Sequence, residues 1–238
     1  MMKRTEVCAL IKQIGIVPAI RVSSAEDAHF AAESVTHGGV PIVEITMTVA
    51  GAIDLISHLV RYHPKMLVGA GTIMDTEMAR KCVDAGASFL TSPGLDQPLI
   101  EFAAKNEIAV LGGALTPTEV VTAWRAGSDF VKVFPCAQVG GDSYIKALKA
   151  PFPQIPLIAA GGVNQQTAAN FILAGATAIG VGAELIPTEA IERRQAARIQ
   201  ELAQRFAGFV KDARARMEAR KPRRVAKDSD GLEKCQEK

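Results

Sequence analysis

The chain has little of what would assign it to several large classes of protein. Its four cysteines stand far apart with no Cys-x-x-Cys pair, which excludes a disulfide framework and a zinc knuckle. Aromatic residues make up only 5% and the net charge is only +2, so we expect no nucleic-acid partner. No apolar run reaches membrane length and no signal peptide is evident, so we expect no membrane association and a reducing cytoplasm.

What the chain does contain is strand-like apolar runs that alternate with helical segments. This alternation predicts an α/β protein, and no Gly-x-Gly-x-x-Gly motif follows the first run, which disfavours a doubly wound dinucleotide binder. We predict a single-domain (β/α)8 TIM barrel over residues 17–187. A helix over 1–16 precedes it, a helix over 188–218 packs on it, and a polar tail covers 219–238. The strands are expected at 17–22, 42–47, 67–72, 89–93, 109–115, 130–135, 157–162 and 178–182.

The stretch 130–135 places Lys132 in an otherwise apolar run, Phe-Val-Lys-Val-Phe-Pro. Side chains alternate along a strand, so Phe130, Lys132 and Phe134 share one face and the lysine points inward. Burial disfavours the ammonium form and frees the amine to attack carbonyl carbon, which is the chemistry of a Schiff-base enzyme. A structural lysine neutralised by a buried carboxylate is the alternative.

Polar residues at the carboxyl ends of the other strands are few. In a TIM barrel the catalytic groups come from these ends. By strand parity Glu44 and Thr46 share a face, so one acid, one amine and the Arg21 guanidinium can converge on one cavity. The remaining candidates in this position are Thr48, Thr72, Ser92, Pro93 and Thr116.

Glycines end the last two predicted strands. Gly161 and Gly162 lead into a helix, and Gly182 ends the final strand. Backbone N–H groups of such a turn bind phosphate or carboxylate, although a tight turn alone would also need glycine. The four histidines all fall in helices or the turns after them, so we expect no metal at the barrel mouth.

Together these residues resemble the family of 2-keto-3-deoxy-6-phosphogluconate (KDPG) and 4-hydroxy-2-oxoglutarate (KHG) aldolases, class I pyruvate aldolases of the Entner-Doudoroff type. The resemblance covers residues from about 17 to 187 in the correct order. The matching motifs are Val-Glu-Ile-Thr-Met-Thr (43–48), Val-Gly-Ala-Gly-Thr (68–72), Ser-Pro-Gly (92–94), Thr-Pro-Thr-Glu (116–119), Val-Lys-Val-Phe-Pro (131–135) and Gly-Gly-Val-Asn (161–164).

The resemblance implies a lyase that cleaves a 2-keto-4-hydroxy acid to pyruvate and an aldehyde without a cofactor. Lys132 would form the Schiff base, Glu44 would shuttle protons and Thr72 would help to hold the carboxylate. Pro93 and Phe134 would line the pocket. The family is typically a homotrimer, and the resemblance implies the same assembly here.

Departures from the family pattern concern both ends of the substrate. Thr48 stands where some members carry arginine, and we expect Arg21 to replace it as the carboxylate anchor. Ala160 and Ala183 stand where hydroxyl side chains are frequent in the family. Without these donors, a substrate phosphate would be bound by the backbone N–H groups of the glycines. Discrimination between gluconate- and galactonate-derived epimers stays open.

Three functions other than this aldolase are also compatible with the sequence. A phosphosugar isomerase or epimerase could use the same barrel and the same anion site, but it needs an acid/base pair. A degenerate barrel could serve as an oligomeric scaffold, although it would not need Lys132 and Glu44 together. The basic residues near the carboxyl terminus could bind nucleic acid, although a charge run is usually a solvated face. These are Arg214, Arg216, Arg220, Lys221, Arg223 and Arg224.

Overall fold

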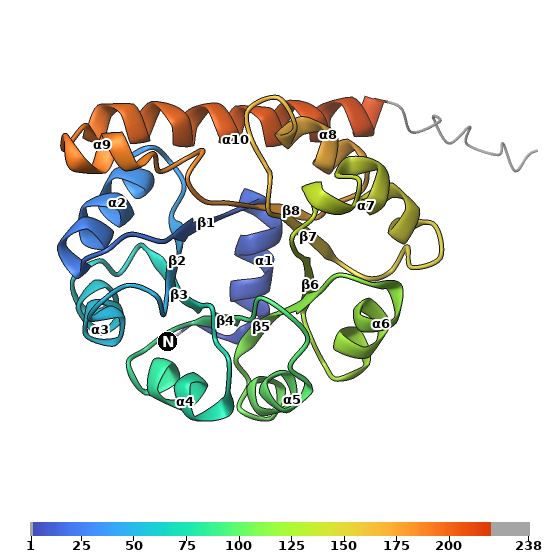
Figure 1. The fold of residues 1–238 in the computed structure, drawn as a ribbon, viewed down its shortest axis with the longest axis horizontal. Helices are drawn as coiled ribbons and strands as arrows, with labels where there is room; N and C mark the ends of the chain where they lie inside the picture. Colours follow the sequence, from blue (N-terminus) through green and yellow to red (C-terminus); the bar gives the residue numbers. More distant parts are fainter. Residues whose placement is uncertain (1, 220–238) are drawn as a thin grey trace, which may run out of the picture.

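The computed structural model describes residues 2–219, and within that range eight parallel strands close into a barrel (Figure 1). Each strand pairs with the next along the chain, and β1 closes the ring by pairing with β8. The predicted TIM barrel is therefore confirmed. The strands are β1 (Ile16–Ile20), β2 (Ile42–Thr46), β3 (Leu67–Gly71), β4 (Phe89–Thr91), β5 (Ala109–Ala114), β6 (Phe130–Val133), β7 (Leu157–Ala160) and β8 (Ala178–Val181).

Side chains of β6 alternate between the barrel interior and the surrounding helices, as strand geometry requires. Phe130 belongs to the apolar cluster inside the barrel, whereas Val131 and Val133 belong to the outer cluster beneath the helices. Lys132 pairs in register with Ile158, which is itself an interior residue. The inward orientation predicted for Lys132 is thus confirmed.

Helix α1 (Arg4–Ile14) closes the end of the barrel at which the strands begin, and Figure 1 shows it lying across the ring of strands. Its buried Val7 and Ile11 pack against the large interior side chains of the strands, among them Phe89 and Phe130. Burial of these apolar groups stabilises this end of the barrel. Within residues 2–219, the interior therefore opens where the strands end, at their carboxyl edge.

The helices outside the barrel begin largely where the sequence predicted. Ser24, Asp75 and Thr116 each accept a hydrogen bond from a backbone N–H in the first turn, which satisfies donors that a helix start leaves free. The helices are α2 (Ala25–His37), α3 (Ala52–Tyr62), α4 (Thr76–Asp84), α5 (Gln97–Lys105), α6 (Pro117–Arg125), α7 (Asp142–Lys149), α8 (Ala168–Leu173), α9 (Thr188–Glu192) and α10 (Ala196–Ala219), with a short 3-10 turn at Ala137–Val139.

The carboxyl-terminal segment forms two helices, where the sequence suggested one over 188–218. The break lies at Arg194, which has a φ of 50°. The Arg194 guanidinium forms ion pairs with Glu26 at 2.7 Å and Asp27 at 3.0 Å, both on α2. After the break α10 packs between α2 and α8 along one edge of the barrel (Figure 1).

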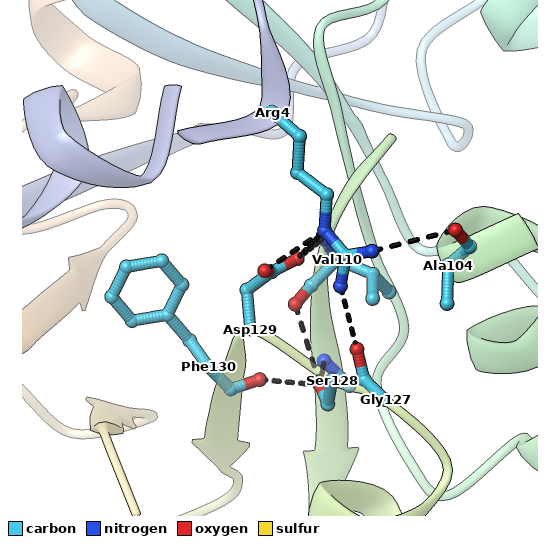
Figure 2. A network of polar contacts seen from close by, with 8 residues as sticks. Arg4, Ala104, Val110, Gly127, Ser128, Asp129 and Phe130 are labelled. Atoms are coloured by element: carbon cyan, nitrogen blue, oxygen red, sulfur yellow. Dashed lines mark hydrogen bonds and ion pairs between the residues drawn. The ribbon is translucent and has the colours of Figure 1, made fainter. Parts of the chain in front are cut away.

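A polar network fixes the start of β6, the strand that carries Lys132 (Figure 2). Arg4 of α1 donates to both carboxylate oxygens of Asp129, at 2.9 and 3.0 Å, and Asp129 also accepts from the backbone N–H of Val110 at 2.9 Å. Ser128 donates to the carbonyl of Phe130 at 2.6 Å and accepts from Gly112 N–H at 2.9 Å. The lysine strand is therefore held to β5 and to the helix that closes the barrel.

The basic carboxyl-terminal residues divide into two groups. Arg214 donates to the backbone carbonyls of Lys12, Gln13 and Thr177, and burial lowers the pKa of its guanidinium. This side chain therefore holds α10 to the barrel. Arg216 is exposed on α10, which also includes Ala219, the first residue of the predicted tail. The rest of that tail, with Arg220, Lys221, Arg223 and Arg224, lies outside the described residues. Within residues 2–219, every helix is too short or too polar to span a lipid bilayer.

Candidate active site

Small residues stand beside Lys132 and Glu44 on the neighbouring strands of the barrel. Ala19, Gly69 and Gly113 lie on β1, β3 and β5, and Ala160 pairs with Gly180 between β7 and β8. Lys132 pairs with Gly113 on β5 and with Ile158 on β7, and Glu44 pairs with both Ala19 and Gly69. Ala19, Ala160 and Gly180 border a hollow into which Lys132 and Glu44 project, whereas the Phe89 ring and the backbone of Pro93 and Gly94 fill the space beside Gly69 and Gly113.

Lys132 and Glu44 face each other across this hollow. Lys132 Nζ lies 3.6 Å from Glu44 Oε1, and the two side chains are 13% and 3% exposed. A charge-assisted hydrogen bond is about 2.7 to 2.9 Å long, so the amine is near the carboxylate without being held tightly by it. The Nζ atom also lies 5.7 Å from the centre of the Phe134 ring, where a cation is attracted by the aromatic face.

A cavity of about 420 Å³ opens from this pair toward the carboxyl ends of the strands. Arg21 lies on its wall and, among the residues described, makes no hydrogen bond or ion pair. A guanidinium without a protein partner can receive a ligand carboxylate in two parallel hydrogen bonds. The predicted site residues on this wall are Arg21, Glu44, Lys132, Phe134, Gly161, Gly162 and Gly182.

The glycine turn after β7 has the backbone conformation that favours glycine. Gly161 and Gly162 have φ values of 82° and 81°, and a Cβ on Gly162 would overlap the Ala137 side chain. The turn is fixed to the loop after β6, because Cys136 N–H donates to the Ala160 carbonyl at 2.8 Å and Ala137 N–H donates to the Gly161 carbonyl at 3.0 Å. The predicted helix start at Asn164 is wrong, since α8 begins at Ala168 after a turn closed by the Asn164 side chain.

Three other predicted residues do not line the cavity. Thr46 is fully buried and its hydroxyl lies 3.0 Å from the Ile20 carbonyl and 2.7 Å from the Thr48 hydroxyl, so it joins β2 to β1. Thr72, with a φ of 59°, and Pro93 stand in the loops after β3 and β4. Substrate contacts by these three stay predictions.

Two polar residues on the cavity wall, Glu184 and Thr188, were not predicted, and neither was the buried Thr91 on β4. Glu184 lines the cavity just after Gly182, at the end where the glycine turn lies, and its side chain is exposed. Thr91 is inward on β4, fully buried, and its hydroxyl has no hydrogen-bond partner within the described range. Glu184 stands in a predicted loop, and a charged residue in a loop over a barrel mouth was the signal that could have identified it.

Cys136 follows the Phe134–Pro135 cis peptide, and its thiol is a nucleophile that could compete with Lys132. Its thiol is buried and donates to the Gly141 carbonyl at 3.4 Å. Burial, with a smaller contribution from Asp142, raises the pKa of this thiol to about 11. The thiolate is the reactive form, so Cys136 is inert at neutral pH, whereas the Lys132 amine lines the cavity.

Gly71 determines where the Glu44 carboxylate can lie. A Cβ on Gly71 would overlap Glu44 Oε1 and the carboxyl carbon. We expect Gly71→Ala to displace the carboxylate from Lys132 and to lower kcat by about 100-fold, because misplacing a catalytic group by about 1 Å has this effect. Steady-state kinetics measure this fall in kcat. The matched control is Gly208→Ala, at a position with open space around the new methyl group; equal losses in both variants would contradict this role for Gly71.

The geometry thus brings together a shielded amine, a buried acid, a free guanidinium and a glycine turn in one cavity. A model of the KDPG and KHG aldolase family matches residues 7–202. The chain is 32% identical over 189 residues to the KHG/KDPG aldolase of Escherichia coli (strain K12), a match that covers 79% of this chain and 88% of the relative. It is 29% identical over 200 residues to the 2-dehydro-3-deoxy-phosphogluconate aldolase of Pseudomonas aeruginosa, covering 84% and 91%.

A solved structure extends this similarity to three dimensions. KDPG aldolase from Legionella pneumophila, with pyruvate captured at low pH as a covalent carbinolamine intermediate, superposes with a TM-score of 0.77 and 30% sequence identity. The superposition covers 83% of this chain and 96% of that chain. A carbinolamine is the adduct of an amine and a ketone, which is the chemistry expected of an inward lysine. The chain belongs to the KDPG and KHG aldolase family.

Proposed function

We propose that Lys132 is the Schiff-base lysine of this aldolase and that Glu44 is its acid/base. The chain is a class I aldolase, a carbon–carbon lyase that cleaves 2-keto-4-hydroxy acids of the KDPG and KHG type to pyruvate and an aldehyde. The observation that carries the residue assignment is the pair itself: Lys132 Nζ lies 3.6 Å from Glu44 Oε1 on the wall of a 420 Å³ cavity.

With these roles, cleavage proceeds through a Schiff base on Lys132. Neutral Lys132 adds to the C2 carbonyl of the keto acid, and the carbinolamine loses water to give an iminium ion. Glu44 removes the proton of the C4 hydroxyl, the C3–C4 bond breaks and its electron pair forms an enamine, while the aldehyde leaves. Glu44 then returns the proton to C3. Hydrolysis of the resulting iminium releases pyruvate and restores the amine.

Arg21 is proposed to hold the carboxylate next to the keto group. We expect Arg21→Ala to raise KM for the keto acid by roughly 10- to 100-fold with a smaller change in kcat, because a hydrogen bond to a charged group contributes about 1.5 to 3 kcal/mol. Arg21→Lys should recover only part of the loss, since lysine cannot form the paired contact. Steady-state kinetics measure both variants. An unchanged KM in Arg21→Ala would show that the carboxylate binds elsewhere.

The far end of the substrate meets the glycine turn and Glu184. The N–H groups of this turn favour an anion, whereas the Glu184 carboxylate opposes a phosphate dianion in the same part of the cavity. We propose that Glu184 weakens the preference for phosphorylated keto acids, while the absence of hydroxyl groups at Ala160 and Ala183 removes donors that would offset it.

A cleavage panel tests both the function and the role of Glu184. It combines phosphorylated and unphosphorylated 2-keto-3-deoxy-sugar acids of both C4 configurations with 4-hydroxy-2-oxoglutarate, and pyruvate release is followed in each. We expect Glu184→Gln to raise kcat/KM roughly 2- to 10-fold for the phosphorylated acids and to leave the neutral-tailed acids unchanged. No pyruvate from any member of the panel would contradict the aldolase assignment, and isomerisation without cleavage would indicate an epimerase or isomerase.

The assembly and the compartment are also proposals. We propose a homotrimer, supported by the resemblance to the family. Light scattering on purified protein gives the mass directly, and a monomer at working concentrations would contradict the trimer. A cytoplasmic location is proposed from the cysteine usage and from the substrate class, and fractionation of cells tests it.

A further inference from the structure

Three of the four histidines of the chain gather at one place on the outside of the barrel. His29 lies on α2, His58 on α3 and His63 in the turn directly after α3. Their ring centres lie 5.3 Å apart for His29 and His58, 5.4 Å for His29 and His63, and 6.3 Å for His58 and His63. One ligand nitrogen from each lies within 4.8 Å of the others. We call this group the histidine cluster.

One carboxylate lies beside two members of the histidine cluster. Glu33 stands one helical turn after His29 on α2, and its oxygens lie 3.6 Å from His29 Nδ1 and 3.9 Å from His63 Nε2. Both distances are too long for strong hydrogen bonds, so Glu33 lies near His29 and His63 without satisfying either ring. One carboxylate can neutralise only one imidazolium, whereas a divalent cation would engage all four groups at once.

The spacing suits a transition-metal ion of the size of zinc. Zn–N bonds of about 2.0 to 2.1 Å place tetrahedral ligands about 3.3 Å apart. Atoms that start within 4.8 Å can reach that spacing by rotations about side-chain bonds, without movement of the helices. The side chains of His29, Glu33 and His63 are 31%, 39% and 26% exposed, so an ion can enter from solvent.

We propose that His29, His58, His63 and Glu33 bind one divalent transition-metal ion of the zinc, nickel or cobalt type. Imidazole nitrogen selects these ions over Mg²⁺ and Ca²⁺, which prefer oxygen ligands. The bound ion joins α2 to α3 and to the turn before β3, and stabilises the packing of these elements. None of its ligands lines the cavity of Lys132 and Glu44, so this ion takes no part in the aldol chemistry.

The proposal is tested by titration of the metal-free protein with Zn²⁺. The protein carries no affinity tag and has Cys235→Ser throughout, so that neither a tag nor that thiol contributes. At mildly alkaline pH we expect one equivalent of Zn²⁺ to bind, to raise Tm and to be displaced by Ni²⁺ but not by millimolar Mg²⁺. Co²⁺ should give the visible absorption of a tetrahedral site without thiolate bands.

Single substitutions then assign the ligands. His58→Ala removes an exposed side chain from α3 and should weaken Zn²⁺ binding at least tenfold and abolish the rise in Tm, and His63→Ala should do the same. The matched control is His37→Ala, which removes the exposed fourth histidine at the end of α2 and should leave both readings unchanged. Binding weaker than the micromolar range, or binding that survives in both cluster variants, would overturn the proposal. Pyruvate release that persists in the metal-free protein separates this test from that of the aldolase.

Discussion

Lys132→Ala will abolish aldol cleavage, with kcat falling by about 10⁴-fold or more, as happens when a covalent nucleophile is removed. The reason is that, among residues 2–219, Lys132 is the one amine on the cavity wall, and only an amine can form an iminium ion with the keto group. The Cys136 thiol is buried with its pKa raised to about 11, and it donates a hydrogen bond to the Gly141 carbonyl. Pyruvate release from the best substrate of the panel measures the loss. Circular dichroism and Tm establish that the barrel still folds.

Chemical trapping makes this prediction specific to one residue. Borohydride added during turnover reduces an iminium to a stable amine, so wild-type protein should gain the mass of reduced pyruvate on the peptide that contains Lys132. Lys146→Ala, on the exposed face of α7, is the matched control and should still be labelled and active. Label on another peptide, or turnover retained in Lys132→Ala, would reject Lys132 as the Schiff-base residue and leave the family membership intact.

The barrel and its lysine could be predicted from the sequence because both depend on local patterns. Alternation along 130–134 determines which face Lys132 takes, and the run is short and apolar enough to be one strand covered on both sides. The same parity places Glu44 in the interior. In each case the side chain's direction follows from its immediate neighbours, and the structure confirms it.

Features that depend on contacts between distant residues could not be predicted in this way. Arg4 meets Asp129 across 125 positions of sequence, and this contact helps to place β6. Nothing local indicates that Arg194 pairs with α2 and that the last helix breaks there. The histidine cluster likewise needs two adjacent helices in their final positions. The sequence pattern predicts elements and faces, whereas the packing of loops and helix surfaces decides which polar groups meet.

Thr46 shows a limit of parity arguments at the site itself. The residue takes the interior face of β2 with Glu44, as predicted, yet its hydroxyl is engaged by the Ile20 carbonyl and by Thr48. A buried hydroxyl needs a hydrogen-bond partner, and a neighbouring strand supplies one as readily as a substrate does. The direction that the strand gives to a side chain therefore identifies candidate site residues. The contacts of each polar atom then decide which of these residues remain available to a ligand.

Glu44→Gln will separate the formation of the Schiff base from the proton transfers that follow it. Glutamine keeps the shape of the side chain but cannot take up a proton, and general acid/base catalysis typically contributes 10²- to 10⁴-fold. We therefore expect kcat to fall by about that factor. KM for the keto acid should change little, because Arg21 rather than Glu44 is proposed to bind the carboxylate.

Two measurements distinguish this role from a structural one. In D₂O, wild-type protein should exchange the methyl protons of pyruvate through the enamine, and Glu44→Gln should lose this exchange while borohydride still labels Lys132. If the Glu44 carboxylate only neutralised the lysine, its removal would impair borohydride labelling and proton exchange together. Glu101→Gln, at an exposed position on α5, is the matched control and should retain both signals. The acid 3.6 Å from the amine is thus assigned to proton transfer only if exchange is lost while the covalent step survives.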